Sequence, residues 1–271
     1  MRGAIEVLGL QKRYGNHQVL QGVSFSVNAG EIFGLLGVNG AGKTTALECI
    51  EGLRKYGGGS IAVHGKLGIQ LQSATLPDHI LGREAIALFA GWNRVKADPA
   101  LLEALGMGEL AKKRYGAMST GQKRRLHLAL AMLRGPDILC LDEPTVGLDV
   151  EGRAALHALI RQWRDQGKTI LLASHDMAEV EALCSRIGIL AEGKIAFLGT
   201  VAELTEKLGK HYTITLKTQG RTERRETDDI GQTLLQLLEQ VQAAGETVLD
   251  IQVSRGSLEQ HFMQIAKGGL T

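Results

Sequence analysis

Residues 35–45 read LLGVNGAGKTT, in which three glycines, a lysine and two threonines follow an apolar run. Gly37, Gly42, Lys43 and Thr44 fit the spacing G-x-x-x-x-G-K-[ST] of a loop that binds phosphate groups. Glycine tolerates positive φ, so successive backbone N–H groups can converge on anionic oxygens. A helix that starts at Lys43 would add the partial positive charge of its N-terminus. The stretch therefore predicts a strand–loop–helix unit that holds nucleotide phosphates.

This loop supplies the first set of candidate ligands. Lys43 is expected to reach the β- and γ-phosphates, and the Thr44 hydroxyl to ligate Mg²⁺. The candidate nucleotide-binding residues of the loop are Gly37, Val38, Asn39, Gly40, Ala41, Gly42, Lys43, Thr44 and Thr45. A glycine-rich turn that only caps a helix is the alternative. The apolar run before the loop and the helical pattern after it favour the phosphate-binding interpretation.

A second stretch, ILCLDE at 138–143, supplies carboxylates. Asp142 would emerge at the carboxyl end of a buried strand, the edge where ligands gather in open α/β sheets. There it is expected to hold Mg²⁺ through a water molecule. Glu143 would point toward the γ-phosphate and polarise an attacking water. A charged strand end without a role is the alternative, and the phosphate loop makes it the weaker one.

The composition excludes several classes of protein. The chain has 271 residues, 44% hydrophobic and 22% charged, with a net charge of +2, which favours neither a nucleic-acid binder nor an acidic solvating domain. Cys49, Cys140 and Cys184 lie far apart in apolar runs, which predicts reduced thiols in a core. Neither a signal peptide nor an apolar run of about 18 residues is present. We therefore expect another chain to supply any membrane part.

Hydrophobic patterning predicts an α/β protein with a largely helical insertion at about 80–135. Strand-like runs rich in Val, Ile, Leu and Phe occupy 5–10, 19–27, 32–37, 60–65 and 67–71. Continuous apolar runs at 137–143 and 168–174 are typical of parallel strands buried on both faces, and a helix at about 151–166 would join them. Trp92 and Trp163 fall in helical patterns and are expected to pack in the core.

The last sixty or so residues have a different pattern. Two alternating or charged strands, a helix with one apolar face, a further strand and a last helix are expected at 211–218, 221–227, about 230–241, 247–253 and 257–266. The sequence thus predicts a main domain over 1–208 and a small α+β appendage over 209–271.

Further motifs narrow the large class of P-loop proteins. MSTGQKRR at 118–125, ASHD at 173–176 and the aromatic Tyr14 make the chain resemble the nucleotide-binding subunit of ABC transporters. The resemblance covers about residues 3–205, with six motifs in the family's order. It implies a P-loop NTPase core with an N-terminal antiparallel β subdomain, a helical ABC subdomain, and ATP with Mg²⁺ as ligands.

By this resemblance, three residues act on the nucleotide within one chain. Tyr14 matches the aromatic that stacks on adenine, and His175 matches the switch histidine that contacts the γ-phosphate. Gln72 in IQLQS matches the glutamine that reaches Mg²⁺ and the lytic water, in a loop that senses the transport subunit. Gln70 is a rival, but Gln72 keeps the family's spacing to the preceding strand.

Other residues would act across a dimer. Ser119, Gly121 and Gln122 match the ABC signature loop, and Asp149 matches the loop that communicates between two cassettes. The usual signature has two adjacent glycines after the serine, and Thr120 replaces the first of them. A β-branched side chain there reduces backbone freedom near a phosphate, where Ser119 and the backbone amides would contact a partner's ATP.

The resemblance also implies how the cycle runs. Two copies of the chain, or the chain and a homologous cassette, would stack head to tail with each ATP between one P-loop and the partner's Ser119 loop. A separate membrane permease would dock near Gln72 and hold the chain at the cytoplasmic face of the membrane. ATP hydrolysis would then drive transport through the permease.

The direction of transport follows from a shorter resemblance. GSLEQHFMQIA at 256–266 is similar to the C-terminal appendage of antibiotic- and drug-export ATPases of the ABC-2 type. An importer cassette, or a non-transport ABC ATPase acting on ribosomes or nucleic acid, is the alternative. The basic runs at 112–114 and 123–125 fit a solvated helix face better than a nucleic-acid site, so no nucleic-acid partner is expected.

Overall fold

The computed structural model describes residues 3–70, 75–207 and 212–255. The chain divides into two compact units, residues 1–198 and 199–271, and each is described by itself. The domain boundary predicted at 208 lies a short way beyond this division. Gln72 and the helix expected at 257–266 lie outside the described residues.

The first unit contains a three-stranded antiparallel sheet of order β2-β1-β4. Its strands are β1 (Ile5–Tyr14), β2 (His17–Val27) and β4 (Gly58–Val63). Ile5 and Val7, two residues apart on β1, are fully buried, as alternation along a half-buried strand requires. β1 and β2 form a hairpin that turns through Gly15, whose φ of +55° suits glycine.

A six-stranded sheet of order β5-β6-β7-β3-β8-β9 forms the centre of this unit. Its strands are β3 (Ile32–Leu36), β5 (Leu67–Gln70), β6 (Ile138–Asp142), β7 (Thr169–Ser174), β8 (Arg186–Ala191) and β9 (Lys194–Gly199). Neighbouring strands from β5 to β8 in this order are parallel. Every residue of β3, β6 and β7 is buried, which for β6 and β7 confirms the prediction of strands covered on both faces.

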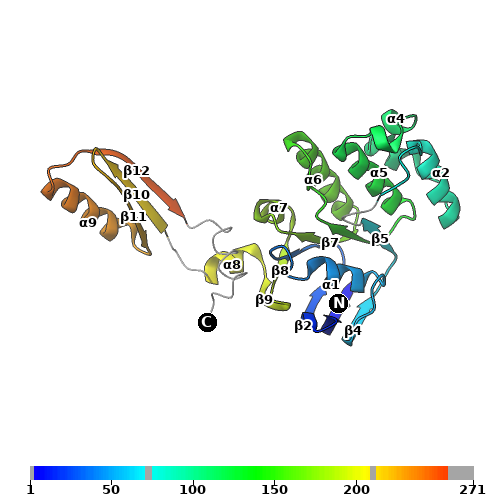
Figure 1. The fold of residues 1–271 in the computed structure, drawn as a ribbon, viewed down its shortest axis with the longest axis horizontal. Helices are drawn as coiled ribbons and strands as arrows, with labels where there is room; N and C mark the ends of the chain where they lie inside the picture. The colour runs from blue at the N-terminus through cyan, green and yellow to red at the C-terminus, as the bar shows by residue number, and fades with distance from the viewer. Residues whose placement is uncertain (1–2, 71–74, 208–211, 256–271) are drawn as a thin grey trace. The chain divides into compact units, whose positions relative to one another are not determined.

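Helix α1 (Lys43–Ile50) lies between the two sheets (Figure 1). One apolar cluster joins β1 and β2 to Leu47 of α1 and to Cys140 and Leu171 of the central sheet. The three cysteines are buried and free, as predicted for core thiols. Because α1 starts where β3 and its loop end, this packing fixes the loop at the carboxyl edge of the parallel strands.

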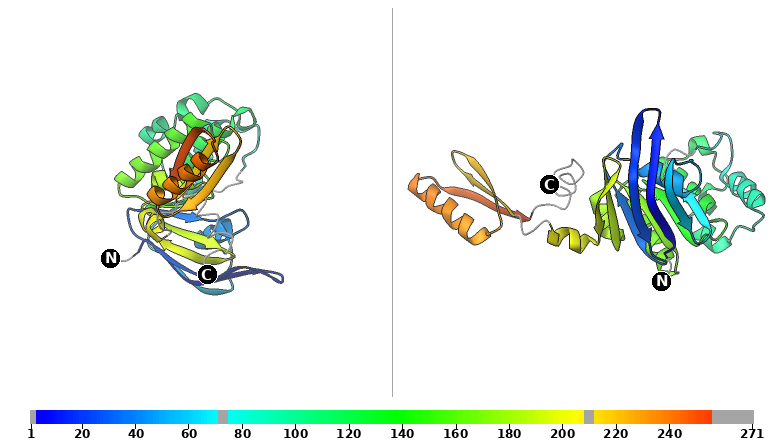
Figure 2. Two further views of the ribbon diagram at one scale, coloured as in Figure 1. Left: turned by 90° about the vertical axis from the view of Figure 1, so that its left-hand side faces the viewer. Right: turned by 90° about the horizontal axis from the view of Figure 1, so that it is seen from below.

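The helical region lies on the side of the central sheet away from the three-stranded sheet (Figures 1 and 2). Its elements are α2 (Gly82–Asn93), α3 (Pro99–Ala104), α4 (Met107–Leu110), the 3₁₀ helix η1 (Tyr115–Ala117) and α5 (Thr120–Met132). Two more helices of this unit follow in the chain, α6 (Val150–Asp165) and α7 (Met177–Leu183). The mixed α/β fold with a helical insertion agrees with the fold class predicted from the sequence.

The two tryptophans differ from one another. Trp163 is 4% exposed, as predicted, but Trp92 is 79% exposed, so the prediction that it packs in the core is wrong. Helix α2 buries the face that carries Ala85, Ile86 and Ala90, and Trp92 lies off that face, where it makes an edge contact with Phe89. Helical periodicity identified the helix but not which of its faces is covered.

The second unit contains an antiparallel sheet of order β11-β10-β12 and one long helix (Figure 2). The short helix α8 (Val201–Lys207) begins this unit, and β10 (Tyr212–Thr218), β11 (Thr222–Thr227), α9 (Ile230–Ala243) and β12 (Val248–Arg255) follow. A small apolar cluster of Ile214, Leu216, Leu237 and Val241 joins the helix to one face of the sheet. Within the described ranges of both units, no helix has the length and apolar composition needed to cross a membrane.

Candidate nucleotide-binding site

The predicted phosphate loop connects β3, which ends at Leu36, to α1, which begins at Lys43. Gly40 and Gly42 have φ of +84° and +106°, in the left-handed region that favours glycine. A Cβ on Gly42 would lie 2.9 Å from Cδ2 of Leu20, and one on Gly37 would lie 2.7 Å from the Leu190 carbonyl oxygen. The loop can therefore follow this path only with glycine at these positions.

Lys43 lies inside the loop with its side chain 5% exposed. Its Nζ donates hydrogen bonds to the carbonyl oxygens of Gly37 at 2.7 Å and of Val38 at 3.3 Å, and lies 3.6 Å from Oε1 of Glu143. Burial lowers the pKa of Lys43, and the charges of Glu143 and Asp142 oppose this effect. The ammonium group is thus held in the loop by acceptors that a nucleotide phosphate could replace.

Asp142 ends β6 and is 3% exposed. Burial raises the pKa of its carboxyl group, and a hydrogen bond with the Thr44 side chain acts in the opposite direction. The Oδ1 atom is buried and has no hydrogen-bond partner among the described residues. An orphaned carboxylate oxygen beside a threonine hydroxyl offers the hard oxygen ligands that Mg²⁺ prefers, so these residues fit the ion.

Glu143 follows in a strained conformation, with φ of +46°. Its backbone N–H donates to the Ala173 carbonyl at 2.9 Å, which holds the turn against β7. Its Oε1 atom lies 2.9 Å from Nδ1 of His175, which follows the end of β7. Lys43 and His175 therefore converge on one oxygen of Glu143, from two different elements. The three residues chosen from separate motifs in the sequence form one contiguous cluster.

Tyr14, the candidate for adenine stacking, lies at the end of β1 and is 40% exposed. Lys12 Nζ and Arg54 Cζ lie 5.0 Å and 5.3 Å from the centre of its ring. These cation–π contacts leave a partly solvated aromatic face beside two cations. Gln70, the rival of Gln72, is 1% exposed in β5, and its amide makes no hydrogen bond within the described part of the chain.

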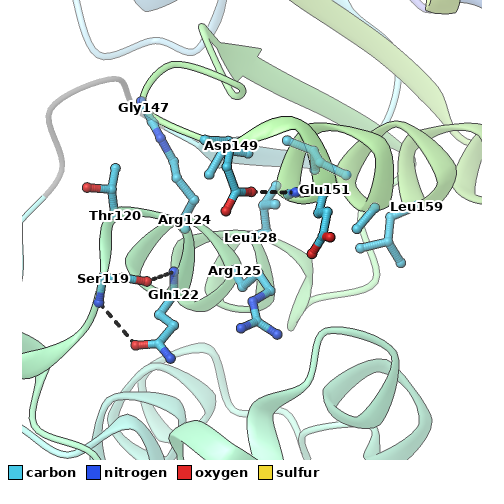
Figure 3. A pocket seen from close by; sticks show the side chains of 15 residues that line it. Ser119, Thr120, Gln122, Arg124, Arg125, Leu128, Gly147, Asp149, Glu151 and Leu159 are labelled. Atoms are coloured by element: carbon cyan, nitrogen blue, oxygen red, sulfur yellow. Dashed lines mark hydrogen bonds between the residues drawn. The ribbon is translucent and has the colours of Figure 1, made fainter.

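A separate pocket of about 570 Å³ contains the other candidates (Figure 3). Ser119 is the N-cap of α5, where its Oγ accepts from the N–H of Gln122 at 3.3 Å and its own N–H donates to Oε1 of Gln122 at 3.0 Å. Asp149 is the N-cap of α6 and accepts from the N–H of Gly152 at 2.8 Å. The N-termini of two helices thus open into one pocket, which suits an anion.

The structure therefore divides the predicted residues into two sets. The phosphate loop, Asp142, Glu143 and His175 form one cluster, whereas Ser119, Gly121, Gln122 and Asp149 line the pocket between α5 and α6. Arg124 also lines this pocket, and the sequence analysis did not single it out. Arg124 follows Thr120 by four residues, and this helical spacing could have predicted that both residues lie on the same side of α5.

Comparisons with known proteins identify the family of the chain. Residues 20–146 match the family described as ABC transporter. Over 240 residues the chain is 34% identical to the linearmycin resistance ATP-binding protein LnrL of Bacillus subtilis. This alignment covers 81% of this chain and 76% of that protein. The chain belongs to the ABC transporter ATP-binding family. It is also 38% identical over 208 residues to the Nod factor export ATP-binding protein I of Burkholderia orbicola, covering 70% of this chain and 68% of that protein.

Solved structures support the same assignment. An ATP-binding subunit of an ABC transporter superimposes with a TM-score of 0.68 at 26% identity, over 76% of this chain and 93% of that chain. A nucleotide-free ATP-binding cassette superimposes with a TM-score of 0.68 at 20% identity, over 76% and 95% of the two chains, which shows the shared fold. The chain is thus the ATP-binding subunit of an ABC transporter and an ATPase.

Proposed function

We propose that this subunit binds and hydrolyses MgATP at the phosphate-loop cluster and thereby powers export through a separate membrane permease. The observation that carries the proposal is the convergence of Lys43 and His175 on Glu143, beside the buried Asp142 and the glycine loop. A buried carboxylate between two basic side chains has the surroundings expected of a group that activates water next to phosphate.

In the proposed mechanism, Lys43 exchanges its two carbonyl acceptors for the β- and γ-phosphates. The backbone N–H groups of residues 38–45 and the N-terminus of α1 would carry the rest of the phosphate charge. Tyr14 would stack on adenine from the end of β1. Binding is thus mostly positioning and charge neutralisation, as phosphoryl transfer requires.

Thr44 and Asp142 would hold the metal ion, and Gln72 is a further candidate that lies outside the described residues. When bound, Mg²⁺ would neutralise charge on the phosphate oxygens. Glu143 would accept a hydrogen bond from the attacking water and orient it, while His175 would keep the Glu143 carboxylate aimed at that water. The strained φ of Glu143 fits a residue held for such a role.

The pocket between α5 and α6 would receive the nucleotide of a second cassette. Ser119 and Asp149 cap the helices that open into it, and both residues are exposed. A second copy of this chain, or a homologous subunit, would therefore complete each site in a head-to-tail dimer. ATP bound between the two would stabilise the dimer, and hydrolysis would release it.

Export is favoured by the names of the relatives, which include a linearmycin resistance protein and a Nod factor export protein. We infer that the cargo is a drug, antibiotic or lipid-like compound, and that the permease holds the subunit at the cytoplasmic face of the membrane. An importer cassette is the second candidate. No observation on the described residues favours a ribosomal or nucleic-acid role.

Transport measured in both directions tests this proposal. Cells that contain the subunit with its permease are loaded with a fluorescent amphiphilic compound, and efflux is compared between wild type and the Glu143→Gln variant. We expect efflux to be faster with the wild type, because the variant lacks the carboxylate that activates water. Accumulation that depends on Glu143 would instead indicate an importer, and transport unchanged in the variant would contradict the assigned role.

A further inference from the structure

His175 lies in a turn that its two neighbours in the chain close. The Ser174 hydroxyl oxygen accepts a hydrogen bond from the backbone N–H of Asp176 at 3.0 Å, so this bond spans His175. The same hydroxyl group donates to Oε2 of Glu179 at 2.6 Å. The His175 side chain is 44% exposed, so packing alone does not fix its ring. The turn therefore sets the direction in which His175 reaches Glu143.

Glu179 is the buried partner of this turn. It lies in α7 and is 3% exposed, and Ser174 is 2% exposed, so the hydrogen bond between them is shielded from water. Burial raises the pKa of Glu179, and the hydrogen bond with the Ser174 side chain acts in the opposite direction. A buried acceptor that loses its donor is costly, so Glu179 holds the Ser174 hydroxyl in one orientation.

Helix α6 contacts the same region at two points. Nη1 of Arg153 lies 2.9 Å from Oδ2 of Asp176, the residue that caps α7. Nε2 of His157 lies 3.8 Å from Oε1 of Glu179, and neither of these two atoms has a hydrogen-bond partner among the described residues. Arg153 and His157 are four residues apart and share one side of α6. The two helices thus hold both ends of the segment from Asp176 to Glu179.

We propose that Glu179 is a positioning residue for ATP hydrolysis. Its carboxyl group holds the Ser174 hydroxyl, and the turn that this hydroxyl closes aims His175 at Glu143. Glu179 acts through these neighbours and does not touch the nucleotide itself. The inference rests on the proposed roles of His175 and Glu143.

Three variants of the full-length chain test this role. Glu179→Ala removes the acceptor, whereas Glu179→Gln keeps an oxygen that can accept from the Ser174 hydroxyl. Glu181→Ala is the matched control, because Glu181 is a glutamate of the same helix with an exposed side chain. The kcat at saturating MgATP and the Kd of a fluorescent ATP analogue are measured for each.

We expect Glu179→Ala to lower kcat about tenfold, since small displacements of catalytic groups are costly, with the Kd for nucleotide within about twofold of wild type. Glu179→Gln should recover most of the rate, and Glu181→Ala should stay within about twofold of wild type. A Glu179→Ala chain with wild-type kcat, a Glu179→Gln chain as slow as Glu179→Ala, or a loss of nucleotide binding as large as the loss of rate would overturn the proposal.

The same substitution in a His175→Ala chain distinguishes positioning from a general loss of structure. If Glu179 acts through His175, Glu179→Ala should change the remaining kcat by less than about twofold, because the ring that the turn aims is absent. A further loss of about tenfold in this background would mean that Glu179 acts elsewhere, and the proposal would be wrong.

Ser174→Ala replaces Glu179→Ala if circular dichroism shows that the latter does not fold. This variant removes the hydroxyl that joins Glu179 to the turn, so it should lower kcat by a similar factor in the wild-type chain and change it little in the His175→Ala chain. Wild-type turnover by Ser174→Ala would overturn the proposal.

His175→Ala alone separates this inference from the function on which it rests. If His175→Ala is slow while Glu179→Ala keeps the wild-type rate, only the role of Glu179 is wrong. If His175→Ala itself hydrolyses ATP at the wild-type rate, the proposed role of His175 is wrong and the role of Glu179 is wrong with it.

Discussion

Lys43, Asp142 and Glu143 are 3–6% exposed and interact with groups of their own chain, whereas Ser119, Thr120 and Asp149 are exposed at an open pocket. In the buried cluster, ion pairs and hydrogen bonds offset the cost of desolvating charged groups. In the pocket, polar side chains cap two helices and leave the helix N-termini accessible.

This difference indicates which half of the site can act alone. A buried cluster with internal partners is organised before the nucleotide arrives, so one chain should bind ATP by itself. The pocket is open, and the side chains of Ser119 and Asp149 cap their own helices. It should therefore act only when a second cassette brings a nucleotide. Removing a group of the buried cluster should therefore change nucleotide binding or the hydrolysis rate, whereas removing a group of the pocket should change dimerisation.

The largest expected effect is on the rate, at Glu143. Glu143→Gln keeps the size of the side chain but removes the negative charge, so ATP binding should be retained or tightened. Water activation should fail, and loss of a general base typically lowers the rate by about 10²- to 10⁴-fold. Steady-state phosphate release and the nucleotide retained after gel filtration measure both effects. Wild-type turnover in this variant would show that Glu143 is not the catalytic carboxylate.

The next effect is on nucleotide binding, at Lys43. Lys43→Ala removes a charged donor to the phosphates, a loss of about 1.5–3 kcal/mol, which weakens the Kd by about 10- to 100-fold. His175→Ala is the comparison, because His175 contacts Glu143 and its side chain is 44% exposed. It should bind the nucleotide nearly normally and turn over slowly. Titration with a fluorescent ATP analogue separates the two, and normal binding by Lys43→Ala would refute its assignment.

A smaller effect should appear on dimerisation, at Ser119. Ser119→Ala removes the N-cap of α5, worth about 1 kcal/mol, and should weaken ATP-driven dimerisation of the Glu143→Gln chain by about fivefold. Nucleotide binding by one chain should not change. Asp229→Ala is the matched control, since Asp229 caps α9 by accepting from the Gln232 N–H at 3.0 Å.

Light scattering with and without MgATP measures this difference. We expect the Glu143→Gln chain to be monomeric without nucleotide and dimeric with it. Dimerisation that is equally strong in the Ser119→Ala and Asp229→Ala backgrounds would exclude the pocket from the interface. A chain that stays monomeric with MgATP would contradict the proposed sandwich and direct attention to Thr120.

The sequence predicts the buried half of the site better than the open half. Residues 37–45 form a local unit whose geometry is specified by glycine, so the motif alone placed it between a strand and a helix. The contact between Glu143 and His175 joins residues 32 apart, and only the pairing of β6 with β7 brings them together. The spacing of these residues in the sequence does not predict this contact, whereas the resemblance to the ABC transporter family assigned both residues to one site.

Tertiary packing decided the features that the sequence did not reveal. Helical periodicity predicted α5, but the pocket between α5 and α6, and the contact of Thr120 with Gly147, depend on how two helices pack. Trp92 was misplaced for the same reason, since the helix pattern does not say which face meets the rest of the protein. The site roles themselves remain predictions that the variants above test.

The smallest effect concerns stability and its dependence on pH, at Glu51. Glu51 follows α1, and both of its carboxylate oxygens are buried without a hydrogen-bond partner among the described residues. Burial, followed by the charges of Asp142 and Glu48, raises the pKa of Glu51 from 4.5 to about 8. The folded chain therefore keeps a proton that the unfolded chain releases.

Between these two pKa values the folded state binds more protons than the unfolded state, so stability must fall as pH rises from about 4.5 to about 8. Glu51→Gln removes this ionisation and should melt a few degrees above wild type at about pH 8, with the difference shrinking toward about pH 5. Glu151→Gln, an exposed residue in the first turn of α6, is the control for the open half and should change the melting temperature little at any pH. Melting curves followed by circular dichroism across this range give the comparison. A difference for Glu51→Gln that does not vary with pH would mean that this carboxyl group is ionised in the folded chain as it is in the unfolded one.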